Sequence, residues 1–492
     1  MTNTDKGSST YLFSIVLVAV LGGLLFGYDT AVISGADKGL QAFFMQATDF
    51  VYTDSIHGVT SSSALIGCVV GSVVSGFLAS RLGRKRSLFV AGILFFLSAL
   101  GSYMPEFLFF EAGKPTFSLL LAFNFYRILG GIGVGLASAV CPMYIAEIAP
   151  SRIRGTLVSW NQFAIIFGQL VVYFVNFMIL GSHINPVISL VDGVNQVVNP
   201  EAARWTIENG WRLMFVSEAV PAGLFTLLVL LVPETPRYLA MKGNDSKALS
   251  VLTRINGNRA AAAILSEIKE TVHEKTERLF TYGWTVIFIG IMLSVFQQAV
   301  GINAVLFFAP RIFDSMGMGN PMQQTVLMGL VNILFTLLAV FTVEKWGRKP
   351  LLMAGSVGMA LGAFGVALCN LVSGLPPMLA VLSIMVYSAS FMFSWGPICW
   401  VLIAEIFPNT IRGAAVAVAV AFQWVFNFIV SSTFVPMYNM RLGEMGDKFG
   451  HMFAYALYGV LCVVAFVFVW KMVPETKGKT LEEMTTLWKK RK

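Results

Sequence analysis

Twelve long apolar stretches constrain the fold of this chain of 492 residues more than any other feature. An α-helix needs about 20 apolar residues to cross a bilayer. Only 12% of the residues are charged, against roughly 25% in a soluble domain, so we expect an all-α integral membrane protein and not a soluble enzyme. The twelve membrane helices are predicted at 12–35, 58–80, 87–105, 117–141, 156–180, 211–233, 281–308, 323–343, 351–371, 377–401, 413–436 and 452–472.

The distribution of positive charge predicts how these helices are oriented. Twenty-six of the 34 Lys and Arg residues lie in the terminal segments or in loops on the same side, against seven in the opposite loops. Because positively charged loops stay in the cytoplasm, both termini are expected there. The net charge of +8 then reflects topology and contact with anionic lipid, not nucleic-acid binding.

The two halves of the chain repeat short motifs in the same order. YIAEIAPSRIRG at 144–155 matches LIAEIFPNTIRG at 402–413 at eight of twelve positions, and GRK at 83–85 and VPET at 232–235 both recur in the second half. Two pseudosymmetric bundles with a site between them form the architecture of alternating-access transporters. The predicted domains are a six-helix bundle at 1–235, a cytoplasmic helical linker at 236–280, a second six-helix bundle at 281–472 and a cytoplasmic tail at 473–492.

Three ionisable residues lie well inside predicted membrane helices: Asp29, Arg127 and Glu218. A charge at the bilayer centre costs roughly 2.5–3.5 kcal/mol on insertion scales, so such residues face inward and have partners. Asp29 and Arg127 form the natural opposite pair, and Asp29 can exchange a proton if that pairing opens and closes. A purely structural ion pair is the alternative. For Glu218 the alternative is a helix-end carboxylate near Arg212.

Neutral amide side chains form a second polar set on the predicted helices. Gln162 and Gln169 are seven residues apart and therefore share one helix face. Amides both donate and accept hydrogen bonds, which suits a neutral polyol. Bonding between helices is the alternative use of each amide. The other polar and indole side chains considered for a sugar site are Gln297, Gln298, Asn303, Asn332, Trp400, Gln423 and Trp424.

Gly396 and Pro397 interrupt the tenth predicted helix, because proline lacks an amide hydrogen and clashes with the preceding turn. Such a break is tolerated where the freed backbone faces a cavity, so we expect a gating bend, with a static kink as the alternative. The five Cys and four His residues show no disulfide or metal-ligand pattern. No catalytic or nucleotide-binding set is found either, so no cofactor is expected.

Several motifs resemble those of the sugar porter family of the major facilitator superfamily. They include RLGRKR at 81–86, YRILGGIGVG at 126–135, PETPRYL at 233–239, QQAVGIN at 297–303, EKWGRKP at 344–350 and VPETKGKTLEE at 473–483. The resemblance implies a functional monomer in a bacterial inner membrane that imports a monosaccharide, with D-xylose favoured and the proton as coupling ion. A facilitator of the same fold and a sugar receptor that does not transport are the alternatives.

The resemblance also implies roles for individual residues. Asp29 matches the carboxylate that proton-coupled members carry and passive members typically lack, with Arg127 as its partner and Glu218 assisting. The chain departs from the family at Phe307 and Phe308, where two tyrosines are usual, so a hydroxyl near the sugar is missing and another pentose or a hexose stays open. The sugar site is expected to contain Phe26, Gln162, Gln169, Gln297, Gln298, Asn303, Phe307, Asn332, Gly396, Trp400, Gln423 and Trp424.

Charged residues at the cytoplasmic helix ends repeat between the halves and are expected to form a latch. Ion pairs across the bundle interface would close the inner mouth and break when it opens. Charges that only set the topology are the alternative. The residues concerned are Arg84, Glu147, Arg154, Glu234, Glu344, Arg348, Glu405 and Arg412.

Overall fold

The computed structural model describes residues 7–107, 111, 113–150, 153–181, 188–191, 194–197, 204–272, 277–317, 320–372, 374–477 and 488. Within these ranges, twelve helical spans are long and apolar enough to cross a membrane, which confirms the predicted number. A short antiparallel hairpin between two of the spans pairs β1 (Ile188–Val191) with β2 (Val194–Val197).

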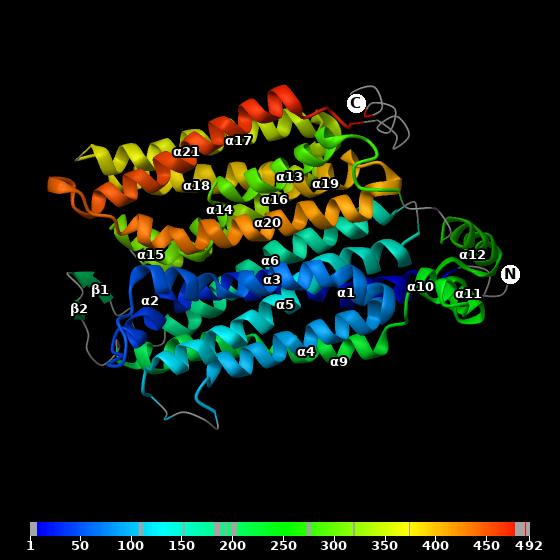
Figure 1. Ribbon diagram of the computed structural model, residues 1–492, viewed down its shortest axis with the longest axis horizontal. Helices are drawn as coiled ribbons and strands as arrows, with labels where there is room; N and C mark the ends of the chain where they lie inside the picture. Colours follow the sequence, from blue (N-terminus) through cyan, green and yellow to red (C-terminus); the bar gives the residue numbers. More distant parts are fainter. Residues whose placement is uncertain are drawn as a thin grey trace.

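The helices form two bundles that lie side by side, with the linker helices at one end (Figure 1). The first bundle contains α1 (Ser9–Ala31), α2 (Ile33–Phe44), α3 (Asp54–Arg81), α4 (Arg84–Tyr103), α5 (Phe117–Ile148), α6 (Arg154–Gly181), α8 (Trp211–Ser217) and α9 (Ala219–Leu231). The second contains α13 (Trp284–Ala299), α14 (Ile302–Phe307), α15 (Ala309–Ser315), α16 (Pro321–Trp346), α17 (Arg348–Leu371), α18 (Pro377–Phe393), α19 (Trp395–Ile406), α20 (Asn409–Tyr438) and α21 (Asp447–Met472).

Two helix pairs make most of the contact between the bundles, α3 against α20 and α6 against α16. Inside the first bundle, α5 packs on both α3 and α4. Glycines on both α5 and α3 allow their close approach, because a Cβ at Gly131 of α5 would lie 1.7 Å from the carbonyl oxygen of Ala64 and one at Gly67 of α3 would lie 2.0 Å from that of Ile128. The GGIGVG motif therefore serves helix packing.

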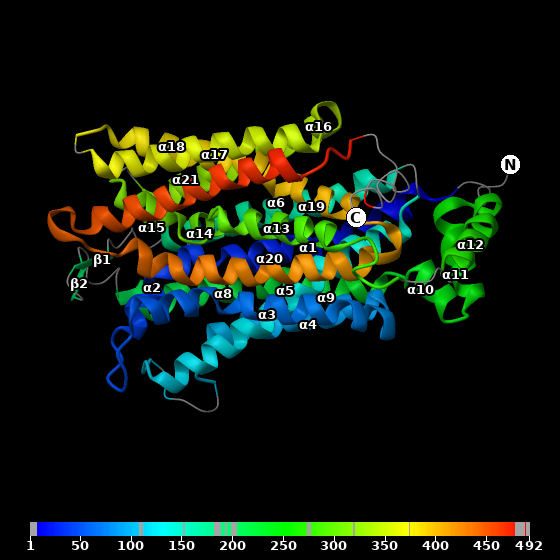
Figure 2. The ribbon, with the colours of Figure 1, turned by 45° about the horizontal axis from the view of Figure 1, so that its top comes forward.

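The linker forms a small helical layer beyond the ends of the membrane helices (Figure 2). It comprises α10 (Pro236–Met241), α11 (Asp245–Asn256) and α12 (Asn258–Val272). The helices α11 and α12 pack around a separate apolar cluster that includes Ala248 and Leu265. The amide of Ser8, directly before α1, donates a hydrogen bond to the carbonyl of Arg254, so the start of the first membrane helix is tied to this layer.

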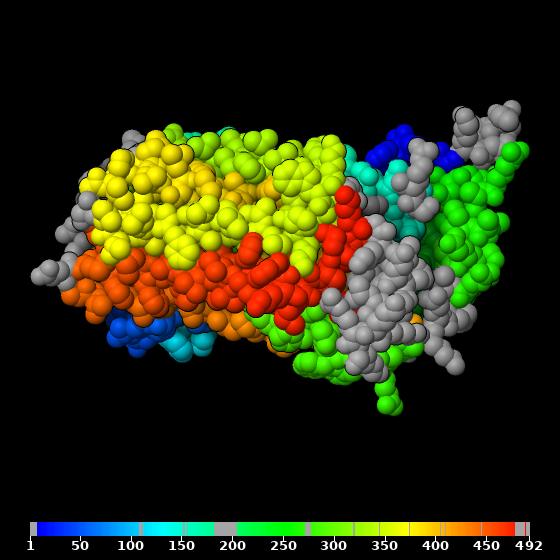
Figure 3. Space-filling view, turned by 90° about the horizontal axis from the view of Figure 1, so that it is seen from above, coloured from blue at the N-terminus to red at the C-terminus, as the bar shows by residue number. Residues whose placement is uncertain are grey.

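The membrane-facing flanks are apolar. Helices α17, α18 and α21 cover one flank of the second bundle (Figure 3). They carry exposed aliphatic side chains such as Leu361, Leu382 and Val460. Because a soluble protein does not expose contiguous apolar faces of this kind, these side chains are the lipid contact of a multi-pass membrane protein.

The first span is longer than predicted. Hydropathy ends it at residue 35, but the structure continues it through α2 to Phe44. Asp37, Lys38 and Gln41 lower the hydropathy of this last part, yet Asp37 and Gln41 are buried because they find polar partners on the second bundle. The continuation brings charged side chains of the first bundle into contact with α15.

The repeated GRK motifs start α4 and α17 in the same way. Gly83 and Gly347 have φ of 95° and 91°, a region open to glycine, and each precedes the first residue of its helix. The carboxylate of Glu234 accepts hydrogen bonds from the amides of Arg84 and Lys85. Glu475 does the same for Arg348 and Lys349. Each carboxylate therefore satisfies free amides at a helix N-terminus.

Candidate transport site

A cavity lies where helices of both bundles meet. Its empty volume is about 750 Å³, a figure that includes space open to solvent. The first bundle contributes α1 and α6, and the second contributes the broken spans α13–α14 and α18–α19 together with α16 and α20. The lining residues are Phe26, Thr30, Gln162, Ile165, Ile166, Gln169, Gln297, Gln298, Asn303, Leu306, Phe307, Thr336, Phe391, Met392, Gly396, Pro397, Trp400, Gln423, Trp424 and Asn427.

The amides of the second bundle are ordered by one another. Gln297 donates from Nε2 to the carbonyls of Trp395 and Gly396, both at 3.1 Å, and its Oε1 accepts hydrogen bonds from Gln298 and Gln423. Asn303 Nδ2 donates to Gln298 Oε1 at 2.5 Å. This network spans α13, α14, α19 and α20, so it presents fixed donors and acceptors to the cavity.

Several polar atoms at the cavity have no protein partner among the described residues. They are Gln169 Oε1, Gln423 Oε1 and the indole Nε1 of Trp424. An unpartnered buried polar atom costs about 1–3 kcal/mol unless a ligand or water satisfies it. The arrangement therefore suits a ligand with several hydroxyl groups, each of which can both donate and accept.

Aromatic rings from both bundles meet at the cavity. Phe26 of α1 and Trp424 of α20 have ring centroids 5.5 Å apart and planes tilted by 51°. Phe307 lines the cavity, whereas Phe308 stacks on Phe434 at 5.2 Å, away from the lining. Of the two positions where the family usually has tyrosine, only Phe307 therefore removes a hydroxyl from this cavity wall.

One residue predicted for the site lies elsewhere. Asn332 is buried on α16, and its Oδ1 accepts a hydrogen bond from Ser388 of α18 at 2.7 Å, so it joins two helices and does not line the cavity. Three lining residues were not predicted for the site: Thr30, Thr336 and Asn427. Each comes four residues after a residue that was considered, so the helical repeat could have indicated them.

The tenth span is broken beside the cavity, two residues before the predicted position. Ser394 separates α18 from α19 with φ of −133° and ψ of −87°. Pro397 has no amide hydrogen, so it cannot donate to the carbonyl of Phe393 four residues earlier, and the carbonyls of Trp395 and Gly396 in the first turn of α19 also accept hydrogen bonds from Gln297. The seventh span is also broken, at Gly301 between α13 and α14, which is left-handed with φ of 92°.

A charged trio is buried in the first bundle, next to the cavity. Arg127 Nη1 donates to Asp29 Oδ1 at 2.6 Å and Nη2 donates to the Asp29 carbonyl at 3.1 Å. Glu218 is fully buried and interacts electrostatically with both. Arg212 instead pairs with Glu106, so Glu218 is not the helix-end partner of Arg212. Asp29 directly precedes Thr30 of the cavity wall.

The trio holds more carboxylates than cations. Asp29 Oδ2 and both oxygens of Glu218 accept no hydrogen bond from the described residues. One guanidinium neutralises one carboxylate, so the trio becomes electrically neutral when it also holds one proton. Such a group can load and release a proton inside the membrane.

The two ion pairs that the structure shows among the residues of the predicted cytoplasmic latch lie within the bundles. Arg84 pairs with Glu147 at 2.7 Å in the first bundle, and Arg348 pairs with Glu405 at 2.7 Å in the second. The reason is the motif itself, because each Arg begins a helix that packs inside its own bundle. These pairs fix the bundles and do not join them.

The remaining charged residues of that prediction vary in their surroundings. Burial raises the pKa of Glu234 above its usual value, against the hydrogen bonds from the amides of Thr235, Lys85 and Arg84. Arg154 begins α6 and is exposed, and Arg412 donates weakly to the Phe407 carbonyl. The side chain of Glu344 lies outside the described residues.

Comparison with known proteins assigns the chain to a family. The sequence model described as "Sugar (and other) transporter" matches residues 15–488. The chain belongs to the sugar transporter family. This transporter is 47% identical to the D-xylose-proton symporter of Escherichia coli K12, over 99% of its own length and 97% of the relative. It is 35% identical to the glucose facilitated diffusion protein of Zymomonas mobilis, over 99% of its own length and 100% of the relative.

Solved structures confirm the expected major facilitator fold of the transporter. A partially occluded, inward-open structure of the xylose transporter of E. coli matches with a TM-score of 0.83 at 44% identity, covering 96% of this chain and all of that one. A structure of the proton:xylose symporter bound to 6-bromo-6-deoxy-D-glucose matches with a TM-score of 0.80 at 45% identity. The match covers 98% of this chain and 99% of that one.

Proposed function

We propose that this protein is a proton-coupled symporter that imports a monosaccharide, with D-xylose as the favoured cargo, by alternating access. The observation that carries the proposal is the buried trio of Asp29, Glu218 and Arg127, in which two carboxylates share one guanidinium. The E. coli relative named a D-xylose-proton symporter supports the cargo and the coupling ion. We further propose a bacterial inner-membrane location with both termini in the cytoplasm, and a monomer as the functional unit.

Coupling follows from the position of the trio on α1. Asp29 sits between Phe26 and Thr30, which line the cavity, and it holds Arg127 of α5. A proton on Asp29 weakens the ion pair and frees α1 to move against α5. Loading of the proton and the fit of the cavity wall around a sugar are therefore linked through one helix. A proton that crosses 100 mV gains about 2.3 kcal/mol, enough to concentrate a sugar tens-fold.

Sugar recognition is assigned to the amide network and the indole rings. Gln162 and Gln169 face the cavity from the first bundle, and Gln297, Gln298 and Gln423 face it from the second. A sugar bound between them contacts both bundles at once, so it can stabilise a closed state that neither bundle forms alone. The Phe at 307 removes one hydroxyl from this wall, which favours a cargo that places an apolar edge there.

Movement is assigned to the breaks at Gly301 and Ser394. Both lie beside the amide network, where the helical hydrogen-bond pattern is already interrupted. A bend at these points changes access to the cavity from either end without breaking further helical bonds. The two bundles are expected to rock about the cavity in the same step.

The experiment is uptake of labelled D-xylose into sealed vesicles with an imposed proton gradient. Wild-type protein is expected to accumulate the sugar, and a protonophore to reduce this to equilibration. Asp29→Asn is expected to abolish accumulation while exchange of sugar down its gradient survives. Glu208→Gln, which removes an exposed carboxylate paired with Arg204, is the matched control and should accumulate sugar normally.

Other outcomes identify the alternatives. Equilibration in the wild type that ignores the proton gradient would make the protein a facilitator, with Asp29 and Arg127 as a structural pair. Sugar binding with no flux at all would make it a receptor. A panel of competing pentoses and hexoses in the same assay tests the cargo.

A further inference from the structure

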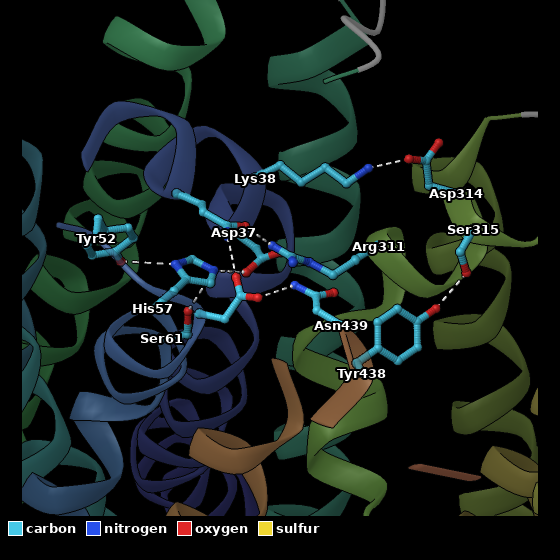
Figure 4. A network of polar contacts seen from close by, with 12 residues as sticks. Asp37, Lys38, Tyr52, His57, Ser61, Arg311, Asp314, Ser315, Tyr438 and Asn439 are labelled. Atoms are coloured by element: carbon cyan, nitrogen blue, oxygen red, sulfur yellow. Dashed lines mark hydrogen bonds and ion pairs between the residues drawn. The ribbon is translucent and has the colours of Figure 1, made fainter. Parts of the chain in front are cut away.

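A group of polar side chains joins the two bundles at the end of the molecule away from the linker helices. It lies where α2 and the start of α3 meet α15 and the end of α20 (Figure 4). The group was not expected from the sequence, and it has no part in the site described above. It lies just past the cavity, because Arg311 follows the lining residue Phe307 by four positions and Asp37 follows Thr30 by seven.

Asp37 and Arg311 form its centre. Arg311 Nε donates to Asp37 Oδ2 at 2.8 Å, and the Arg311 Nη2 donates to Gln41 Oε1 one helical turn further along α2. Both charged side chains are buried, with exposed fractions of 2% for Asp37 and 9% for Arg311. One guanidinium of the second bundle therefore donates hydrogen bonds to two residues of the first.

His57 holds the other oxygen of the same carboxylate. Its Nε2 lies 2.6 Å from Asp37 Oδ1, and its Nδ1 lies 3.0 Å from the hydroxyl of Tyr52. With the Tyr52 hydroxyl donating to Nδ1, the Nε2–H donates to the carboxylate. The Asp37 carboxylate is thus held from α3 on one side and from α15 on the other, so its orientation toward Arg311 is fixed.

Two peripheral contacts cross the same interface. Lys38 of α2 pairs with Asp314 of α15, and these side chains are 29% and 30% exposed. Asp54, at the start of α3, accepts from Gln41 at 3.2 Å and from Asn439 at the end of α20 at 2.9 Å. The centre is therefore buried and the periphery half-exposed, as expected of a contact that closes against solvent.

We propose that Asp37 and Arg311 form the centre of an ion-pair latch that closes this end of the cavity, supported by His57, Lys38 and Asp314. The proposal rests on the proposed alternating-access function. Opening this end separates the bundles here and places both charges in water, so the latch sets how often the cavity opens to the outside. It assigns a gating role to residues that touch neither sugar nor the Asp29 proton site.

The test measures how fast the cavity opens to the outside. A cysteine is placed at Thr30 in a Cys369→Ser background, because Cys369 alone among the native cysteines is not buried. A membrane-impermeant maleimide is added outside intact cells, and its rate of reaction with Thr30→Cys is recorded. D-Xylose uptake is measured on the same cells.

The variants are graded along the latch. Asp37→Asn/Arg311→Gln removes the central pair without leaving a lone buried charge, and it should speed labelling by at least about fivefold. Lys38→Gln/Asp314→Asn removes the half-exposed pair, cannot strand a buried charge, and should give a smaller increase. Asp447→Asn removes an exposed pair with Arg441 within the second bundle, and it should leave the rate within about twofold.

Each outcome decides the proposal. Faster labelling in the order of these variants supports the latch. Labelling of Asp37→Asn/Arg311→Gln at the wild-type rate, in cells whose wild-type protein transports D-xylose, overturns it and leaves the proposed function intact. Absence of uptake by the wild type overturns the proposed function separately.

Discussion

The two ends of the molecule use charge differently. At the end near the linker helices, the charged motifs are repeated in both bundles, and their ion pairs Arg84–Glu147 and Arg348–Glu405 stay within one bundle. At the opposite end, Asp37–Arg311 joins the bundles, and the part of the chain that the structure describes holds no second copy of this pair. The repeated charges therefore stabilise each bundle internally, whereas the unrepeated charges form contacts between the two bundles.

The repeated end is symmetric in detail. Thr235 donates to Glu147 at 2.6 Å, and Thr476 donates to Glu405 at 2.6 Å. In both bundles a further carboxylate, Glu234 or Glu475, caps the helix that begins with the paired arginine. An interface contact needs no such duplication, because one residue from each bundle is enough to make it.

The largest expected effect is on the stability of the first bundle. Glu147→Gln leaves the Arg84 guanidinium buried without its partner, so the free energy of unfolding should fall by about 3 kcal/mol. Thermal unfolding in detergent measures this. The Asp37→Asn/Arg311→Gln variant should change by less than about 1 kcal/mol in the same assay. An equal loss in both would erase the distinction between the two ends.

A smaller effect is expected when the equivalent ion pair of the second bundle is broken. Glu405 is 30% exposed, against 11% for Glu147, so water screens its pair with Arg348 more strongly. Arg348→Gln should therefore lower the free energy of unfolding by about 1–2 kcal/mol. Transport by the folded fraction of this variant should remain coupled to protons. A loss as large as that of Glu147→Gln would show that exposure does not separate the two copies.

The smallest effect is a pH dependence at Glu234, which lies outside the membrane spans. Burial raises its pKa, so the folded state favours the protonated form and gains stability from it at low pH. That contribution is lost as pH rises through the raised pKa. Relative to Glu234→Gln, the wild type should therefore become more stable by a few tenths of a kcal/mol between pH 7 and pH 5. A difference that does not change with pH would contradict the assignment.

The features that could be predicted from the sequence are those set by a residue's own chemistry or by its local helical repeat. Asp29 and Arg127 had to be inward-facing and paired, because charges inside a membrane helix leave few alternatives. The helical repeat placed Gln162 and Gln169 on one face, and both line the cavity. The number of spans followed from hydropathy alone.

Contacts between residues that are far apart in the sequence could not be predicted. Asp37 and Arg311 are 274 residues apart, and Asp37 lies past the point where hydropathy ends the first helix. No local pattern joins them. Asn332 was misplaced for a related reason, since the residue that binds it, Ser388, is known only once α16 and α18 are packed. The rotation of a helix against its neighbours is a tertiary property.

Proton movement driven by sugar tests the central claim most directly. Purified protein in proteoliposomes with no imposed gradient is given D-xylose outside, and the internal pH is followed. Wild-type protein should carry protons inward with the sugar, so the lumen acidifies, and Asp29→Asn should let sugar equilibrate with no change in pH. Entry of D-xylose through the wild type at constant internal pH would contradict the account.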